Sequence, residues 1–134
     1  MARILIVEDN ADNLELIRFI LEAFGHTPLG ATSGRDGVDA ARRDRPDLIL
    51  MDLQMPGMDG FEALEELRSD SSFAATPLIA LTALAMVGDR ERALRAGFDG
   101  YITKPIAPET FVSTLDEFLP GGLRSSGRTA FRLA

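Results

Sequence analysis

The stretch "LILMDLQMPGMDGFE", residues 48–62, begins as a short apolar run, reaches an aspartate at position 52 and continues into a turn-rich loop with Pro56, Gly57 and Gly60. An unbroken apolar run of this length, bounded by turn residues, is typical of a strand buried on both faces of a parallel sheet. Asp52 is therefore expected at the carboxyl end of a buried strand. A carboxylate next to a core needs partners, which directs attention to the ends of the other strands.

The same strand-then-helix arrangement repeats along the whole chain. The first helix is the clearest, because apolar residues recur at helical spacing from Leu14 to Phe24, and Asn10 or Asp12 can cap its start before Gly25 ends it. Strands are expected at residues 3–9, 27–31, 47–52, 77–83 and 100–105, and helices at 11–24, 34–43, 59–68, a segment ending near 97, and 108–119.

Strands that alternate with helices predict a parallel sheet with helices on both faces, so the fold class is α/β. The pattern covers residues 1–119 as one domain. Residues 120–134, "PGGLRSSGRTAFRLA", contain three arginines and no acid, and we expect a flexible basic tail there. These tail residues are too few to form a DNA-binding or enzymatic domain.

Composition excludes several classes of function. The 134 residues carry a formal net charge of −7, which disfavours direct DNA binding by the body of the protein. The sequence has no apolar run near the roughly 18 residues of a membrane span and no cysteine. We therefore expect a cytoplasmic protein that does not cross a membrane.

The ends of the predicted strands carry the chemistry. In such a sheet, ligands bind outside the carboxyl ends of the strands. The residues found there are Glu8, Asp9, Asp52, Thr82 and Lys104. Carboxylates suit Mg²⁺, and a lysine supplies a positive charge for an oxyanion. The pattern predicts a magnesium-dependent phosphoryl site in which a carboxylate can act as nucleophile.

Four motifs at these strand ends, "VED", "MDLQMPGMDG", "LTA" and "KP", resemble those of the receiver domain of two-component response regulators. The resemblance covers residues 1–119 and implies a flavodoxin-like sheet with strand order 2-1-3-4-5. It also implies partners, namely a sensor histidine kinase or a histidine phosphotransfer protein upstream and a target protein downstream. A phosphorylation-dependent dimer is left open.

The resemblance assigns a role to each site residue. Asp52 would accept the phosphoryl group, with self-phosphorylation and self-dephosphorylation chemistry of its own, in a signalling protein rather than an enzyme. Thr82 and Tyr101 would form the conformational switch. Mg²⁺ would be held by Glu8, Asp9, Asp52 and the backbone carbonyl of Gln54, the phosphoryl oxygens would be contacted by Thr82 and Lys104, and Pro105 would follow a cis peptide bond.

Other interpretations of the same residues remain. An aspartate-nucleophile phosphatase would place a second aspartate two residues after the first, where this chain has Gln54. A module that binds partners without switching would not need the acceptor, the threonine and the lysine together. A flavin-binding domain would need a phosphate-binding loop after the first strand, where acids stand instead.

Three smaller expectations complete the analysis. The resemblance implies that the residues two after Asp52 and two after Thr82, here Gln54 and Leu84, tune how long the phosphoryl group survives; an apolar Leu84 offers no help in orienting an attacking water, so self-dephosphorylation should be modest. Gly60 should allow the chain to pass close to neighbouring backbone. His26 follows the first helix and is interpreted as incidental.

Overall fold

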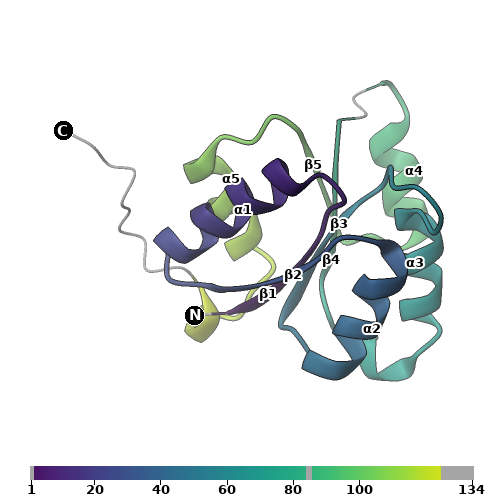
Figure 1. The fold of residues 1–134 in the computed structure, drawn as a ribbon, viewed down its shortest axis with the longest axis horizontal. Coiled ribbons are helices and arrows are strands. Elements are labelled where there is room, and N and C mark those ends of the chain that lie inside the picture. Colours follow the sequence, from purple (N-terminus) through teal and green to yellow (C-terminus); the bar gives the residue numbers. More distant parts are fainter. Residues whose placement is uncertain (1, 84–85, 125–134) are drawn as a thin grey trace.

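In the computed structural model, which describes residues 2–83 and 86–124, five parallel strands form one sheet in the order β2-β1-β3-β4-β5 (Figure 1). The strands are β1 (Arg3–Val7), β2 (Thr27–Ala31), β3 (Leu48–Asp52), β4 (Leu78–Thr82) and β5 (Gly100–Thr103). The helices are α1 (Ala11–Ala23), α2 (Gly34–Asp44), α3 (Gly60–Arg68), α4 (Asp89–Ala96) and α5 (Pro108–Asp116). Both the predicted α/β class and the predicted strand order are confirmed.

The helices cover the sheet on both faces. Helices α1 and α5 lie on one face, and α2, α3 and α4 lie on the other (Figure 1). Because side chains alternate along a strand, Leu50 of β3 packs on the α1 and α5 face, whereas Met51 packs on the opposite face. Within the described ranges, none of the helices has the length and apolar character needed to cross a bilayer.

Local capping residues fix where the helices begin. Of the two candidates for α1, Asn10 is the cap, and its side chain accepts a hydrogen bond from the Asn13 backbone N–H at 3.0 Å. Helix α3 begins with a capping box, in which Asp59 and Glu62 each accept a bond from the other's backbone N–H. The cap at Asp59 starts α3 directly after the loop that follows Asp52.

Some boundaries differ from the predicted ones. Strand β1 ends at Val7 rather than Asp9, and β5 ends at Thr103 rather than Pro105, because a proline has no N–H to continue the ladder. Helix α5 ends at Asp116 rather than Leu119. There the N–H groups of the next residues bond carbonyls three residues back, which tightens the helix into a turn. Leu119 is nevertheless buried, and this burial explains why the apolar pattern extended the prediction.

The start of the predicted tail contacts the domain. Gly121–Leu123 form a 3₁₀ turn, and Leu123 packs against the apolar layer under α1 and α5. Arg124 donates a hydrogen bond from Nε to the Leu119 carbonyl at 3.1 Å. The remainder of the tail, residues 125–134, lies outside the described residues.

Candidate metal and phosphoacceptor site

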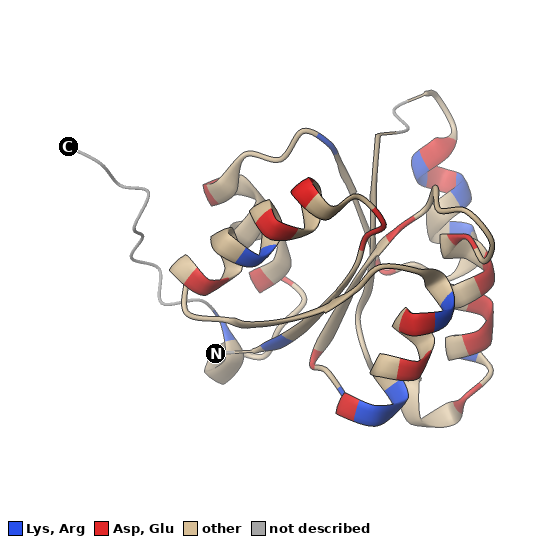
Figure 2. Ribbon diagram, in the orientation of Figure 1, with Lys and Arg blue, Asp and Glu red and all other residues tan. Residues whose placement is uncertain are grey.

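The carboxyl ends of β1 and β3 bring three acids together. Carboxylate oxygens of Glu8, Asp9 and Asp52 lie within 4.8 Å of one another. Red segments mark these strand ends near the middle of the sheet, and a blue segment follows β5 (Figure 2). Glu8 and Asp52 are buried, with 1% and 5% of their surface exposed, while Asp9 is exposed. The sequence prediction that these acids meet is therefore confirmed.

Lys104 lies against two of these acids. Its Nζ atom is 2.6 Å from Glu8 Oε1 and 3.2 Å from Asp52 Oδ2. Burial would lower the pKa of Lys104, but the hydrogen bond to Glu8 and the charge of Asp52 outweigh it, so this pKa lies above its ordinary value. Burial raises the pKa of Glu8 even though the bond to Lys104 opposes the shift. One ammonium group thus contacts two buried carboxylates.

Backbone groups orient these carboxylates. The Gln54 N–H donates to Asp52 Oδ1 at 3.0 Å, and the Asn10 N–H donates to Glu8 Oε2 at 3.2 Å. Gly60 passes the carbonyl of Asp52 so closely that a Cβ atom on it would lie 2.5 Å from that oxygen. The close approach expected at Gly60 is therefore present, and a larger residue would displace the loop that carries Gln54.

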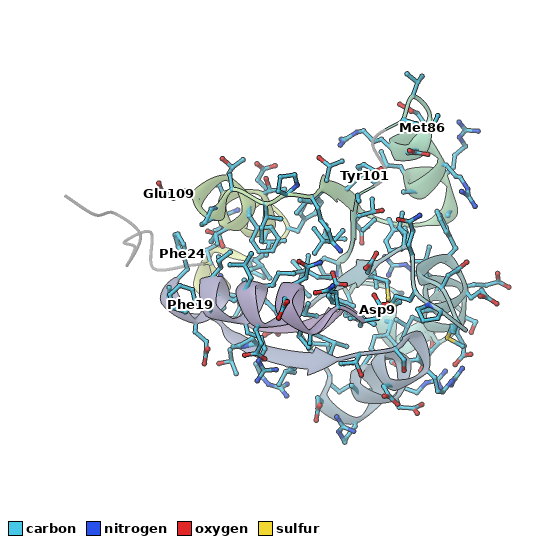
Figure 3. The ribbon with its side chains drawn as sticks, turned by 45° about the horizontal axis from the view of Figure 1, so that its top comes forward. Asp9, Phe19, Phe24, Met86, Tyr101 and Glu109 are labelled. Carbon is cyan, nitrogen blue, oxygen red and sulfur yellow. The ribbon has the colours of Figure 1, made fainter. Side chains whose placement is uncertain are left out.

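The two predicted switch residues lie on neighbouring strands. Thr82 ends β4 and is fully buried, and Tyr101 on β5 pairs in register with Ala80. Since Ala80 and Thr82 are two residues apart, Thr82 and Tyr101 project from the same face of the sheet. Tyr101 is half-buried and stands above Asp9 in Figure 3; burial and the charge of Asp89 raise its pKa.

Lys104 directly follows β5 and precedes a cis peptide bond. The Lys104 N–H donates to the Thr82 carbonyl at 2.8 Å, which fixes the end of β5 beside that of β4. The peptide bond between Lys104 and Pro105 is cis, as the resemblance implies. The prediction for Leu84 falls on a residue outside the described ranges.

The acid cluster fits a magnesium ion. Mg²⁺ binds oxygen ligands at about 2.0–2.1 Å, so ligands on opposite sides of the ion are about 4.2 Å apart. Adjacent ligands of an octahedral Mg²⁺ are about 2.9 Å apart, so three oxygens within 4.8 Å of one another could share one ion after drawing together by about 1 Å each. Three carboxylates against one ammonium group also leave an excess of two negative charges, which a divalent cation would balance.

An acid cluster that could hold a metal ion, beside a lysine, separates this chain from the nucleotide- and flavin-binding domains with a similar sheet, which hold phosphate at a turn before a helix. The fold and the site define a phosphoryl-accepting signalling domain. The family model of the response regulator receiver domain matches residues 4–116, and the chain belongs to this family of two-component signalling proteins.

Individual relatives agree with this assignment. The polar-differentiation response regulator DivK of Brucella anthropi is 42% identical over 116 residues, which cover 87% of this chain and 94% of the relative. The chemotaxis protein CheY4 of Vibrio cholerae has a TM-score of 0.83 at 31% identity, covering 89% of this chain and 99% of that one.

A third relative bears on the metal. The receiver domain of a sensor histidine kinase from Pseudomonas aeruginosa is 38% identical with a TM-score of 0.81, covering 87% of this chain and 96% of that one. That structure has a magnesium ion coordinated in its active-site cleft.

Sequence reasoning missed one buried polar residue. His26 is not incidental: it is 3% exposed, and its Nδ1 atom accepts a hydrogen bond from the Ala2 N–H at 3.0 Å. Its Nε2 atom lies 3.5 Å from Asp116 Oδ1. His26 lies before β2, away from the acid cluster, so it belongs to the packing of the domain. A single histidine in a loop leaves no periodic signal that could have revealed this.

Proposed function

We propose that Asp52 accepts a phosphoryl group from a phosphohistidine of a sensor kinase or of a phosphotransfer protein. One observation carries this choice among the three acids. Asp52 ends the central strand β3, so it lies between the acids after β1 and Thr82 at the end of β4. It is the carboxylate that has the proposed metal ligands on one side and the proposed phosphoryl-binding groups on the other.

Each neighbouring group has a part in the transfer. Phosphoryl transfer depends mainly on in-line positioning and charge neutralisation. The Gln54 N–H holds the Asp52 carboxylate in one orientation while an oxygen of Asp52 forms the new O–P bond and the donor's P–N bond breaks. Lys104, already near Asp52, would move to an oxygen of the transferred group. Mg²⁺ held by Glu8, Asp9, Asp52 and the Gln54 carbonyl would neutralise charge on the phosphoryl oxygens.

The output would come from Thr82 and Tyr101. A new phosphoryl group on Asp52 offers acceptor oxygens next to the Thr82 hydroxyl, which would favour a conformation in which Thr82 moves toward them. Tyr101 shares that face of the sheet and would move inward, reshaping the surface of α4, β5 and α5. A downstream protein would read this surface. The modest self-dephosphorylation expected from Leu84 stays a prediction, and Leu84→Asp tests it.

Intact mass spectrometry tests the proposal. The unaltered protein, incubated with Mg²⁺ and a small-molecule phosphodonor, should gain one phosphoryl group, and EDTA should prevent the gain. Asp52→Asn should gain none, whereas the matched control Asp36→Asn, on α2, should behave like the unaltered protein. The sequence has one tyrosine and no tryptophan, so tyrosine fluorescence reports on Tyr101 alone and should change with phosphorylation.

A second candidate is an interaction module that does not switch. It would be favoured if neither the unaltered protein nor Asp52→Asn gained mass. Phosphorylation without any change in Tyr101 fluorescence would retain the acceptor chemistry and remove the proposed switch.

A further inference from the structure

One face of α1 is apolar although it does not face the sheet. Leu14 and Ile17 are buried beneath the helix, whereas Leu16 and Phe19 are 49% and 59% exposed. Residues three apart share a face of a helix, so Leu16 and Phe19 form one outward stripe. Figure 3 shows Phe19 near the end of α1, together with Phe24.

This stripe continues into a groove beside the phosphoacceptor site. The groove has a volume of about 360 Å³, and Leu16 and Ile17 of α1 line it together with Lys104, Pro105 and Ile106 from the end of β5 and the loop that follows it. We call Leu16, Phe19 and this groove the α1 face. A protein or segment bound on this face would lie against Lys104, which contacts Asp52.

The charge around the α1 face is negative. Helix α1 carries Asp12, Glu15 and Glu22 against one arginine, Arg18, which lies 3.8 Å from Glu15. Helix α5, which covers the same face of the sheet, carries Glu109 and Asp116 and no basic residue. An occupant that combines apolar and basic side chains would complement both features.

The chain itself supplies such a segment. Residues 125–134, "SSGRTAFRLA", hold two arginines and no acidic side chain, with Phe131 and Leu133 on either side of Arg132. The described chain ends at Arg124, just after Leu123 packs on the layer formed with α1 and α5. Phe131 is seven positions beyond Arg124, and seven residue steps can span about 23 Å when extended. Helix α1 has 13 residues and is about 20 Å long, so this span is comparable with the length of the helix.

We propose that residues 125–134 dock in cis on the α1 face, with Phe131 and Leu133 against the apolar stripe and Arg128 and Arg132 toward the acids of α1 and α5. A short tether gives an effective concentration on the order of 1 mM, so even a contact with a Kd of about 1 mM would be formed about half the time. The docked segment covers the groove beside Lys104 and competes with any protein that binds there. The proposed competition depends on the proposed role of Asp52, whereas the proposed docking does not depend on it.

Amide chemical shifts measured by NMR on the full chain test the docking. Phe131→Asp removes an apolar anchor and adds a negative charge, whereas the control Thr129→Asp adds the same charge and keeps both apolar side chains. Phe131→Asp should shift the amides of residues 16–23 and of Ile106, Thr129→Asp should shift them by clearly less, and the shifts should not depend on protein concentration.

Three results would overturn the proposal. Shifts confined to residues 125–134 would mean that the segment does not dock, and shifts centred on the other exposed apolar pair, Met86 and Val87, would place it elsewhere. Shifts that grow with protein concentration would mean that a second copy binds. Phosphoryl gain from a small donor should be the same in both variants and the unaltered protein, so a failure of docking is distinguishable from a failure of the Asp52 chemistry.

Discussion

At the carboxyl edge of the sheet, where the strands end, three carboxylates lie together and one ammonium group contacts two of them. At the amino edge, where the strands begin, a partly buried arginine is surrounded by partners. There Arg68 donates to the carbonyls of Phe73, Thr76 and Gly97 and lies 2.7 Å from Asp99. Asp99 also accepts from the Leu78 N–H at 2.8 Å.

The difference shows how the same sheet can carry stability at one edge and chemistry at the other. At the amino edge the arginine donates hydrogen bonds to carbonyls of the turn and loops that precede β4 and β5. At the carboxyl edge the excess negative charge destabilises the domain in the absence of a cation and creates a demand for one. Substitutions at the carboxyl edge should therefore mainly change phosphoryl gain and Mg²⁺ binding, whereas substitutions at the amino edge should mainly lower stability.

The largest expected effect is on the rate of phosphoryl gain at the carboxyl edge. Lys104→Met removes the ammonium group that would contact the transferred group, and it should slow phosphoryl gain by about 10²–10³-fold. The same substitution removes a competing positive charge, so Mg²⁺ should bind more tightly. Time-resolved intact mass and a Mg²⁺ titration measure the two effects, and parallel loss of both would show that the lysine acts by maintaining the fold.

At the amino edge we expect a loss of stability without a loss of chemistry. Arg68→Met removes the arginine donor from the carbonyls of Thr76 and Gly97, and it removes one of two donors from the Phe73 carbonyl and from Asp99. It should lower the free energy of unfolding by about 2–3 kcal/mol, the half-exposed ion pair contributing the smaller share. Urea unfolding measures the change. If phosphoryl gain by the folded variant fell as well, the two edges would not be independent.

A smaller, pH-dependent effect should come from His26, also at the amino edge. Burial lowers the pKa of His26 below its ordinary 6.5, although the Asp116 carboxylate opposes the shift. The unfolded chain therefore binds the proton more readily, and stability that is present above pH 6.5 should fall as the pH decreases from there toward the folded pKa. His26→Asn can still accept a hydrogen bond but does not titrate, so its unfolding free energy should change less between pH 7 and pH 5. Equal slopes for the two proteins would contradict this account.

Most site residues at the carboxyl edge could be predicted from the sequence, because the ends of buried parallel strands can be recognised from their apolar runs. Glu8, Asp52 and Lys104 are 44 and 52 residues apart along the chain, yet each follows an apolar run, and runs of this kind end at one edge. What could not be predicted is how the charges pair. That Lys104 lies closer to Glu8 than to Asp52 depends on side-chain geometry that no spacing encodes.

The contacts at the amino edge could not be predicted from the sequence. Arg68 follows the pattern of a basic residue in the last turn of a helix, and its contacts with three loop carbonyls depend on how the loops pack. The end of α5 was misplaced for a related reason, since Leu119 is buried by a turn rather than by the helix. Apolar periodicity records burial and does not record which backbone geometry achieves it.

The most direct test of the unbalanced carboxyl edge is a calorimetric titration with Mg²⁺. The matched pair is Asp9→Asn at this edge and Asp47→Asn at the amino edge, where Asp47 accepts a bond from the Arg3 N–H at 2.8 Å. The account predicts one binding site in the unaltered protein and in Asp47→Asn, and affinity at least about tenfold weaker in Asp9→Asn. Equal affinity in all three proteins, or no binding in the unaltered protein, would contradict it.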